Sequence, residues 1–274
     1  MDVRTFYWDP MRGRSRWDIL IGKALRRNTA IRKNAGDAFN VDLLNWAYAG
    51  YDVRNVDDEG SRLLLVGSIA HRMQHGDVIC GIGSKNGILP DAKQARVEVY
   101  GVRGPLTLEA FKTAGHDVSR VSFMADPGLL IGKIFPDLLA IDAVPNKVSF
   151  IPHYRERSSY PATKDYDLID IEDDAFAVAK KIRKAEFIYT SSLHGLIWAH
   201  ALDRPALLIA PQSGEELFKY EDYFSSISHR FIYANDISQA LQMRKAVSPI
   251  DIGHVLETIS LPNADELRRH RIIS

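Results

Sequence analysis

Two serines, a histidine and a glycine follow a strand-like segment late in this chain. The segment 187–190 is rich in β-branched and aromatic side chains, and an apolar run of helical length begins soon after it. The pattern predicts a strand, a tight turn and a helix that carries His194 in its first turn and Gly195 beside it. Ser191 or Ser192 can cap this helix, whose free N–H groups attract an anion. These residue types in this order could bind an anion and move a proton.

A second candidate site lies far upstream. The strand-like segment 97–100 leads to Arg103, Gly104 and Pro105. Proline suits the first position of a helix, so a second helix start is predicted beside a fixed cation. Two strand-to-helix turns, one with an arginine and one with His194, are what a cleft between two α/β halves would present. On spacing alone, a packed histidine without a catalytic role stays open for His194.

Short apolar strands alternate with helical segments along most of the chain. The predicted strands are 63–68, 78–80, 97–100, 121–125, 147–152, 167–170, 186–190 and 205–209. A break near residue 145 separates the first four from the others. The alternation predicts an α/β fold of two Rossmann-like parallel-sheet domains that face a cleft, with residues 1–145 in the first and 146–274 in the second.

The composition excludes several classes of protein. The 35 basic and 35 acidic residues give a net charge of zero, which argues against general nucleic-acid binding. The single cysteine, Cys80, excludes an internal disulfide, and its strand-like surroundings predict a core residue in a reducing compartment. No apolar stretch approaches the roughly eighteen residues of a membrane span, and no secretory signal is recognised at the start. A cytoplasmic location is therefore expected.

Basic residues are concentrated near the start of the chain. Eight lysines and arginines and one acid, Asp18, lie between Arg12 and Lys33. A solvated helix face accounts for such a run. The alternative is peripheral docking at the inner face of the cytoplasmic membrane or on a phosphate-bearing acceptor. Both interpretations stay open, as does the oligomeric state, with a homo-oligomer among the options.

Other patterns are less specific. The loops 81–87 and 34–37 could cradle phosphate, although neither matches a P-loop or a dinucleotide fingerprint. Asp126, which precedes Pro127 at a strand end, could be catalytic, accept a sugar hydroxyl or cap a helix. No set of histidines and acids has metal-ligand spacing, so no metal site is expected. A serine hydrolase is disfavoured because no Gly-x-Ser-x-Gly elbow occurs.

Five motifs in a fixed order resemble a known family. They are Asn34-x-Gly36-Asp37, Arg103-Gly104-Pro105, Asp126-Pro127-Gly128-Leu129-Leu130, Pro152-His153-Tyr154 and Ser192-Leu193-His194-Gly195-Leu196. The ordered set, which spans residues 34–222, resembles the polysaccharide pyruvyl transferases. The resemblance implies a fold like that of GT-B glycosyltransferases. It also implies transfer of the enolpyruvyl unit of phosphoenolpyruvate to a sugar, which gives a pyruvate ketal and phosphate without a cofactor.

The resemblance also implies roles for individual residues. The family's functional arginine falls on Arg103, its histidine on His194 as the catalytic acid/base, and its downstream lysine on Lys219, the only lysine between His194 and Lys245. The full set expected to bind substrate is Arg103, Lys219, Ser191, Ser192, Gly195, Gly36, Asp37, Asp126 and His153.

The expected protein is therefore a phosphoenolpyruvate-dependent pyruvyltransferase of polysaccharide assembly. Its acceptor would be a saccharide or a lipid-linked saccharide. Two alternatives remain: a GT-B-like glycosyltransferase that uses a nucleotide sugar, and a catalytically silent sugar-binding assembly protein. The sequence does not identify the acceptor sugar, its reacting hydroxyls or the ketal stereochemistry.

Overall fold

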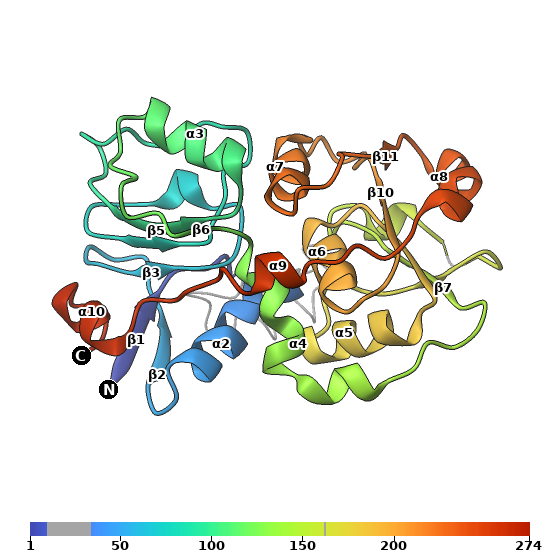
Figure 1. The fold of residues 1–274 in the computed structure, drawn as a ribbon, viewed down its shortest axis with the longest axis horizontal. Helices are drawn as coiled ribbons and strands as arrows, with labels where there is room; N and C mark the ends of the chain where they lie inside the picture. Colours follow the sequence, from blue (N-terminus) through green and yellow to red (C-terminus); the bar gives the residue numbers. More distant parts are fainter. Residues whose placement is uncertain (10–33, 162) are drawn as a thin grey trace, which may run out of the picture.

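The chain forms two parallel sheets covered by helices (Figure 1). The computed structural model describes residues 1–9, 34–161 and 163–274. Within each sheet, every pair of neighbouring strands is parallel. The predicted α/β fold with two Rossmann-like parallel sheets is confirmed. The basic segment 12–33 lies outside the described residues, so its predicted docking role stays a prediction.

The first sheet has six strands in the order β2-β1-β3-β4-β5-β6. They are β1 (Asp2–Thr5), β2 (Asp52–Asn55), β3 (Leu63–Leu64), β4 (Val78–Cys80), β5 (Glu98–Val102) and β6 (Phe123–Met124). Helix α2 (Ala35–Ala47) connects β1 to β2, and α3 (Pro105–Thr113) connects β5 to β6. Cys80 is fully buried in β4, as predicted.

The second sheet has five strands in the order β11-β10-β9-β7-β8. They are β7 (Val148–Ile151), β8 (Asp167–Leu168), β9 (Phe187–Thr190), β10 (Ala206–Ile209) and β11 (Tyr233–Ala234). Its helices are α5 (Ala175–Lys184), α6 (Leu193–Ala201), α7 (Phe218–Ser226) and α8 (Ile237–Met243). Every residue of β7, β9 and β10 is buried, which is typical of a parallel sheet covered on both faces.

Both sheets share one winding order. When the strands of each sheet are numbered by their order along the chain, the first strand lies between the second and the third. The spatial order is then 2-1-3-4-5 in both sheets, and the first sheet adds a sixth strand at its end. The direction of winding reverses between β1 and β3 in the first sheet and between β7 and β9 in the second. Ligands of doubly wound sheets bind beyond the carboxyl ends of the strands at this reversal. The topology therefore favours a site where these two strand ends face each other.

The two halves are joined by packed apolar side chains. The short helix α4 (Ile131–Ile134) follows the first sheet, and α2 packs against α4, α5 and α6 at the junction (Figure 1). Phe39 of α2 contacts Trp198 of α6 edge to face, with ring centroids 5.6 Å apart. Short 3₁₀ turns complete the connections; they are Ala70–Arg72, Pro127–Leu130, Pro136–Ala140, Arg157–Ser159 and Arg244–Ala246. One apolar cluster therefore runs through both halves.

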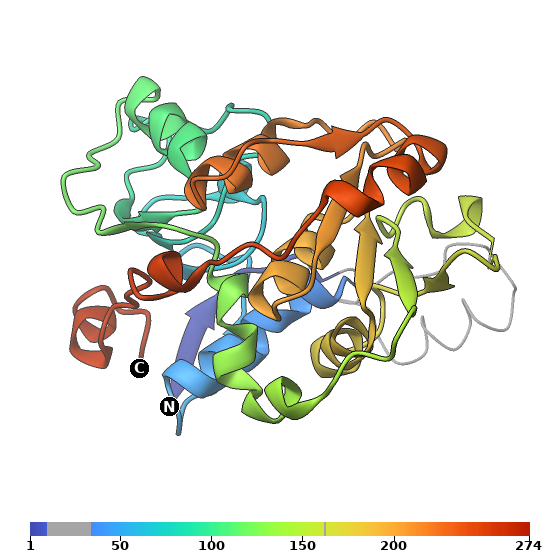
Figure 2. The same cartoon turned by 45° about the vertical axis from the view of Figure 1, so that its right-hand side comes forward.

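The end of the chain returns to the first sheet. After α9 (Gly253–Leu256) and α10 (Ala264–Arg269), Ile273 forms an antiparallel bridge with Val3. Figure 2 shows the two termini close together beside β1. The predicted division into domains near residue 145 stays a prediction. The returning segment follows this division in the sequence but packs on the first sheet. Among the described residues, none of the helices has the length and apolar character that a bilayer-spanning helix needs.

Candidate active site

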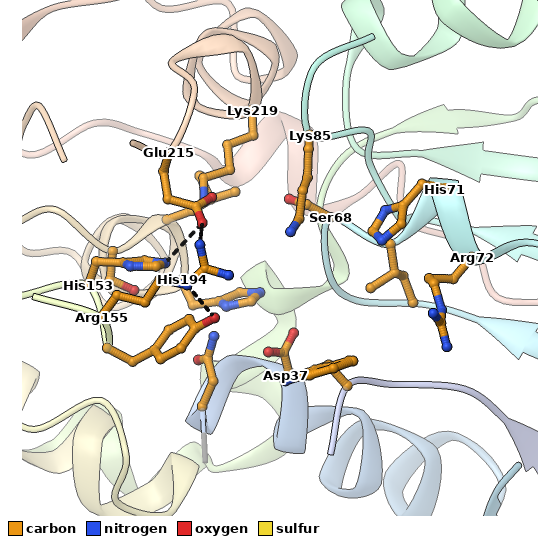
Figure 3. Close-up of a pocket in the computed structure, with 16 residues that line it drawn as sticks. Asp37, Ser68, His71, Arg72, Lys85, His153, Arg155, His194, Glu215 and Lys219 are labelled. Atoms are coloured by element: carbon orange, nitrogen blue, oxygen red, sulfur yellow. Dashed lines mark hydrogen bonds and ion pairs between the residues drawn. The ribbon is translucent and has the colours of Figure 1, made fainter. Parts of the chain in front are cut away.

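A pocket of about 270 Å³ lies beyond the carboxyl ends of strands from both sheets (Figure 3). Its wall includes residues that follow β1, β3 and β4 in the first half and β7, β9 and β10 in the second. The lining residues are Trp8, Asn34, Asp37, Ser68, Ile69, His71, Arg72, Lys85, His153, Tyr154, Arg155, Ser192, Leu193, His194, Glu215 and Lys219. The pocket thus lies at both winding reversals, where the topology favours a site.

His194 reaches the pocket from the first turn of α6. The predicted strand, cap and helix are confirmed, because β9 ends at Thr190 and the Ser192 hydroxyl accepts a hydrogen bond of 3.3 Å from the Gly195 N–H. The His194 side chain is buried. Its Nε2 has no hydrogen-bond partner in the described part of the chain. A buried polar atom without a partner beside a pocket is suited to a ligand or a reacting group.

The surroundings of His194 hold it neutral at pH 7. Burial lowers its pKa to about 3, and the positive charges of Lys219 and Arg103 act in the same direction. Both effects disfavour the imidazolium form. An anion bound beside His194 would oppose both effects and favour the imidazolium form.

Gly36 lets α2 approach the imidazole of His194. The Asn34 side chain caps α2 by accepting a hydrogen bond of 3.0 Å from the Gly36 N–H. A Cβ atom on Gly36 would lie only 1.9 Å from Nδ1 of His194. Gly36 itself does not line the pocket. The first turn of α2 therefore sets the position of the histidine ring and leaves no room for a side chain.

We expect Gly36→Ala to reduce turnover on the order of 10²-fold, because the added methyl must displace the His194 ring. The melting temperature would also fall, since overpacking costs roughly 1–3 kcal/mol. Steady-state kinetics and thermal unfolding measure both effects. Gly132→Ala is the control, because a Cβ there meets its nearest neighbour at an ordinary 3.5 Å. Unchanged turnover in Gly36→Ala would show that this contact does not position His194.

Lys219 enters the pocket from α7. Its Nζ donates a hydrogen bond of 2.7 Å to Oε2 of Glu215, whose Oε1 lies 3.1 Å from a guanidinium nitrogen of Arg155. Burial lowers the pKa of Lys219, and the carboxylate of Glu215 opposes this shift. Glu215 thus compensates two cations on the second half's side of the pocket.

The pocket has an excess of positive charge. Four fixed cations line it, namely Arg72, Lys85, Arg155 and Lys219, against two carboxylates, Asp37 and Glu215. Lys85 forms no ion pair with any described residue, whereas Lys219 and Arg155 share Glu215. Cations from both halves could therefore hold a compact anion between them.

Arg103 does not line the pocket. It is fully buried, and all three guanidinium nitrogens donate to protein atoms. Nε donates to Oδ2 of Asp222 at 3.0 Å, Nη1 to Oγ of Ser68 at 2.6 Å and Nη2 to the carbonyl of Ser84 at 2.6 Å. Oδ1 of Asp222 accepts the N–H of Thr107 at 2.9 Å. The carboxylate beside this helix start comes from Asp222 in the other half of the chain, and the predicted contact of Arg103 with substrate stays a prediction.

Three more expected substrate-binding residues lie behind the pocket wall. Ser191 donates to Oε2 of Glu156 at 2.7 Å and accepts the N–H of His153 at 2.8 Å. Oδ1 of Asp126 accepts the Gly128 N–H at 2.8 Å, which is the capping role left open from the sequence. A Cβ on Gly195 would lie 2.7 Å from the Thr190 hydroxyl, so this glycine serves close packing.

His153 lines the pocket beside Glu215. Its Nδ1 lies 3.4 Å from the Ser213 hydroxyl, and burial lowers its pKa to about 4. Buried Glu156 also accepts the N–H of Ser213 at 2.8 Å. One carboxylate thus ties the turn before α6 to the loop that carries Glu215. Of the ten expected site residues, the pocket lining includes His194, Lys219, Ser192, Asp37 and His153.

Several lining residues were not predicted from the sequence. Lys85 had a partial signal, since the glycine-rich loop 81–87 was a candidate phosphate cradle. Arg155 follows the motif that contains His153. Trp8 and Glu215 had no local signal, because only the folded chain brings them to the pocket. Within the described ranges, no group of three or more histidine, cysteine, aspartate or glutamate side chains is arranged to hold a metal ion.

Comparisons with known proteins find two relatives and one solved structure. The protein L143 of Acanthamoeba polyphaga mimivirus, described as uncharacterized, is 32% identical over 174 residues, covering 59% of this chain and 58% of its own length. The succinoglycan biosynthesis protein ExoV of Rhizobium meliloti is 28% identical over 204 residues, covering 71% of this chain and 61% of its own. The chain thus spans about three fifths of each relative. A solved structure of an uncharacterized Klebsiella pneumoniae protein is 14% identical, covering 81% of this chain and 100% of its own, with a TM-score of 0.44.

The family match covers the centre of the chain. Residues 92–213 match the family described as polysaccharide pyruvyl transferase. This region contains β5 to β10 and both helix starts, with His153 and His194 in the pocket wall. The resemblance to the polysaccharide pyruvyl transferases that the five motifs indicated is thus confirmed over this region.

Proposed function

We propose that this protein transfers the pyruvyl unit of phosphoenolpyruvate to a sugar of a polysaccharide or of its lipid-linked precursor. The observation that supports this most is a cation-rich pocket around His194, with lysines from both halves. Phosphoenolpyruvate carries a carboxylate and a phosphate on three carbons, and such a compact anion needs several fixed donors and cations. The similarity to ExoV, a succinoglycan biosynthesis protein, supports a polysaccharide context.

The donor would lie between Lys85 and Lys219. Figure 3 shows both lysines on the same side of His194, one from each half of the chain. Lys219 is held in place by Glu215, whereas Lys85 keeps an uncompensated charge among the described residues. The free N–H groups at the start of α6 add donors for the same anion. This arrangement binds the donor with side chains, and no metal or redox cofactor is proposed.

The proposed reaction begins with a proton on the methylene carbon of the donor. Protonation creates an oxocarbenium-like centre at C2, which a sugar hydroxyl attacks; phosphate then leaves and a second hydroxyl closes the ketal. Bound phosphoenolpyruvate would raise the pKa of His194, since a nearby negative charge favours the imidazolium. His194 would take up a proton as the donor binds and deliver it to the methylene carbon.

We expect Lys85→Gln to weaken phosphoenolpyruvate binding by about 10–100-fold, the loss of one charge-assisted contact. Isothermal titration calorimetry measures the dissociation constant without turnover. Lys93→Gln is the matched control, because Lys93 is an exposed lysine of the same half outside the pocket lining. Equal affinity in the wild type and in Lys85→Gln would remove Lys85 from the donor site.

The direct test of the function is phosphate release. Phosphoenolpyruvate is offered with a panel of lipid-linked saccharides, in EDTA, and inorganic phosphate is followed over time. We expect release that depends on both substrates, and a rise in melting temperature with phosphoenolpyruvate alone. A rise with a nucleotide sugar and none with phosphoenolpyruvate would favour a glycosyltransferase. Activity lost in EDTA and restored by magnesium would contradict a metal-free mechanism.

A further inference from the structure

Asp37 is a carboxylate in a pocket whose cations suit an anion. It comes from the first turn of α2, directly after the glycine that contacts the His194 ring. Figure 3 shows it across His194 from Lys85 and Lys219. The other pocket carboxylate, Glu215, is paired with two cations. Asp37 forms no ion pair with a described residue.

A carboxylate in this position repels an anionic donor. Its partner in catalysis should therefore be a neutral group with a proton to lose, and a sugar hydroxyl is such a group. Oδ1 of Asp37 also lies close to Gly67, where an added Cβ would be 3.3 Å away. The pocket thus has a cationic side at the two lysines and an acceptor side at Asp37.

The protonation of Asp37 suits this task. Burial raises its pKa to about 7, although the charges of Lys219 and Lys85 and a hydrogen bond with Asn34 lower it. A general base is most efficient when its pKa lies near the working pH. The charged or titratable groups around it are Lys219, Lys85, Asp126, His194, His71 and Arg72.

We propose that Asp37 is the catalytic base that takes the proton of the attacking sugar hydroxyl, an inference that rests on the proposed function. As the hydroxyl O–H bond breaks, its proton moves to Asp37 and its oxygen bonds to C2 of the enolpyruvyl unit. The electron pair of the C2–C3 double bond takes the proton carried by His194, which makes the methyl group. The C2–O bond to phosphate then breaks, and its electron pair leaves with the phosphate.

The second sugar hydroxyl completes the balance. Its oxygen forms the second bond to C2, and its proton leaves on the phosphate as hydrogen phosphate. Asp37 then returns its proton through solvent, and His194 regains one. One of the two hydroxyl protons therefore balances the hydrogen added to the methyl group. The other proton leaves on the released phosphate.

The test is the Asp37→Asn variant. We expect turnover to fall at least 100-fold, while calorimetry with phosphoenolpyruvate alone shows unchanged or tighter binding, because a negative charge has left the pocket. Asp37→Glu should recover part of the turnover, since it keeps the carboxylate. Asp42→Asn is the control, because Asp42 is a half-buried aspartate of the same helix outside the pocket lining.

A stability measurement confirms that the variant folds. The folded protein holds the proton of Asp37 up to its pKa of about 7, whereas the unfolded chain releases it near the ordinary pKa of 3.8. The contribution of Asp37 to stability therefore falls as pH rises from about 4 to about 7. Asp37→Asn removes this loss, so the melting temperature of the variant relative to the wild type should be higher at pH 8 than at pH 5.

The outcomes separate the two proposals. Wild-type protein that neither binds phosphoenolpyruvate nor releases phosphate overturns the proposed function, and the inference with it. Wild-type activity together with near-normal turnover in Asp37→Asn overturns only the inference. A large loss of phosphoenolpyruvate binding in a folded Asp37→Asn variant also overturns the inference, because Asp37 would then contribute to donor binding.

Discussion

Replacing His194 with alanine is expected to reduce turnover by about two to four orders of magnitude while the protein stays folded. The histidine lines the pocket from a capped helix start, and its Nε2 has no partner among the described residues. A Cβ on Gly36 would lie 1.9 Å from its Nδ1, so the ring is closely packed against α2. The loss should appear mainly in kcat, since Lys85 and Lys219 remain to bind the donor.

His200 provides a matched control for this variant. It lies on the same helix, is also buried, and burial lowers its pKa to about 3 as well. Its Nδ1 lies 2.9 Å from the Tyr223 hydroxyl, and it does not line the pocket. His200→Ala should lower the melting temperature and leave turnover nearly unchanged. Near-normal turnover in a folded His194→Ala would show that another group supplies the proton.

The pH dependence of stability gives an independent check on the state of His194. Below pH 6.5 the unfolded chain protonates this histidine, whereas the folded protein does so only near pH 3. The neutral, buried imidazole therefore costs stability as pH falls through 6.5. His194→Ala should show a smaller fall in melting temperature between pH 7 and pH 5 than the wild type.

Local patterns predicted the elements that carry the site. The strand, serine cap and helix around His194 and the proline-started helix after Gly104 were both predicted, because capping and proline preferences act within a few residues. The segment 34–37, predicted as a loop, is instead the cap and first turn of α2. Asparagine favours both settings, so the residue type alone could not separate them.

Elements at the edges of the sheets were harder to predict. β1 and β2 were missed because three of the four residues in each strand are charged or polar, as Asp2–Thr5 and Asp52–Asn55 illustrate. β2 is an edge strand with exposed and half-buried residues in alternation, so it lacks the apolar run of a central strand. The two-residue strand β11 is too short to give a periodic pattern.

The contacts that assemble the pocket could not be predicted from spacing. Arg103 was expected to meet a substrate anion, but Asp222, 119 residues away in sequence, supplies the carboxylate. Gly104 allows this approach, since a Cβ there would lie 2.2 Å from the Asp222 carbonyl. An arginine beside a helix start indicates a site that binds an anion. The pattern does not show whether this anion is a ligand or a carboxylate of the protein itself.

Asp222→Ala is accordingly expected to destabilise the protein by about 3–5 kcal/mol, because it leaves the buried guanidinium of Arg103 uncompensated. The Thr107 N–H and hydroxyl lose their acceptors as well. Chemical denaturation measures the loss. Arg103→Ala should be similarly costly, since it leaves the Asp222 carboxylate buried without its cation.

The double variant Arg103→Met/Asp222→Leu separates a structural role of Arg103 from donor binding. Replacing both charges by apolar groups removes the unpaired charge, so much of the stability should return. If Arg103 serves only to join the halves, the dissociation constant for phosphoenolpyruvate should stay within about tenfold of the wild-type value. The remaining change would come from small shifts of Ser68 and of the loop that carries Lys85, because Arg103 donates hydrogen bonds to Ser68 and Ser84. Recovered stability with donor affinity weakened by roughly 2–4 kcal/mol would instead show that Arg103 contacts the donor.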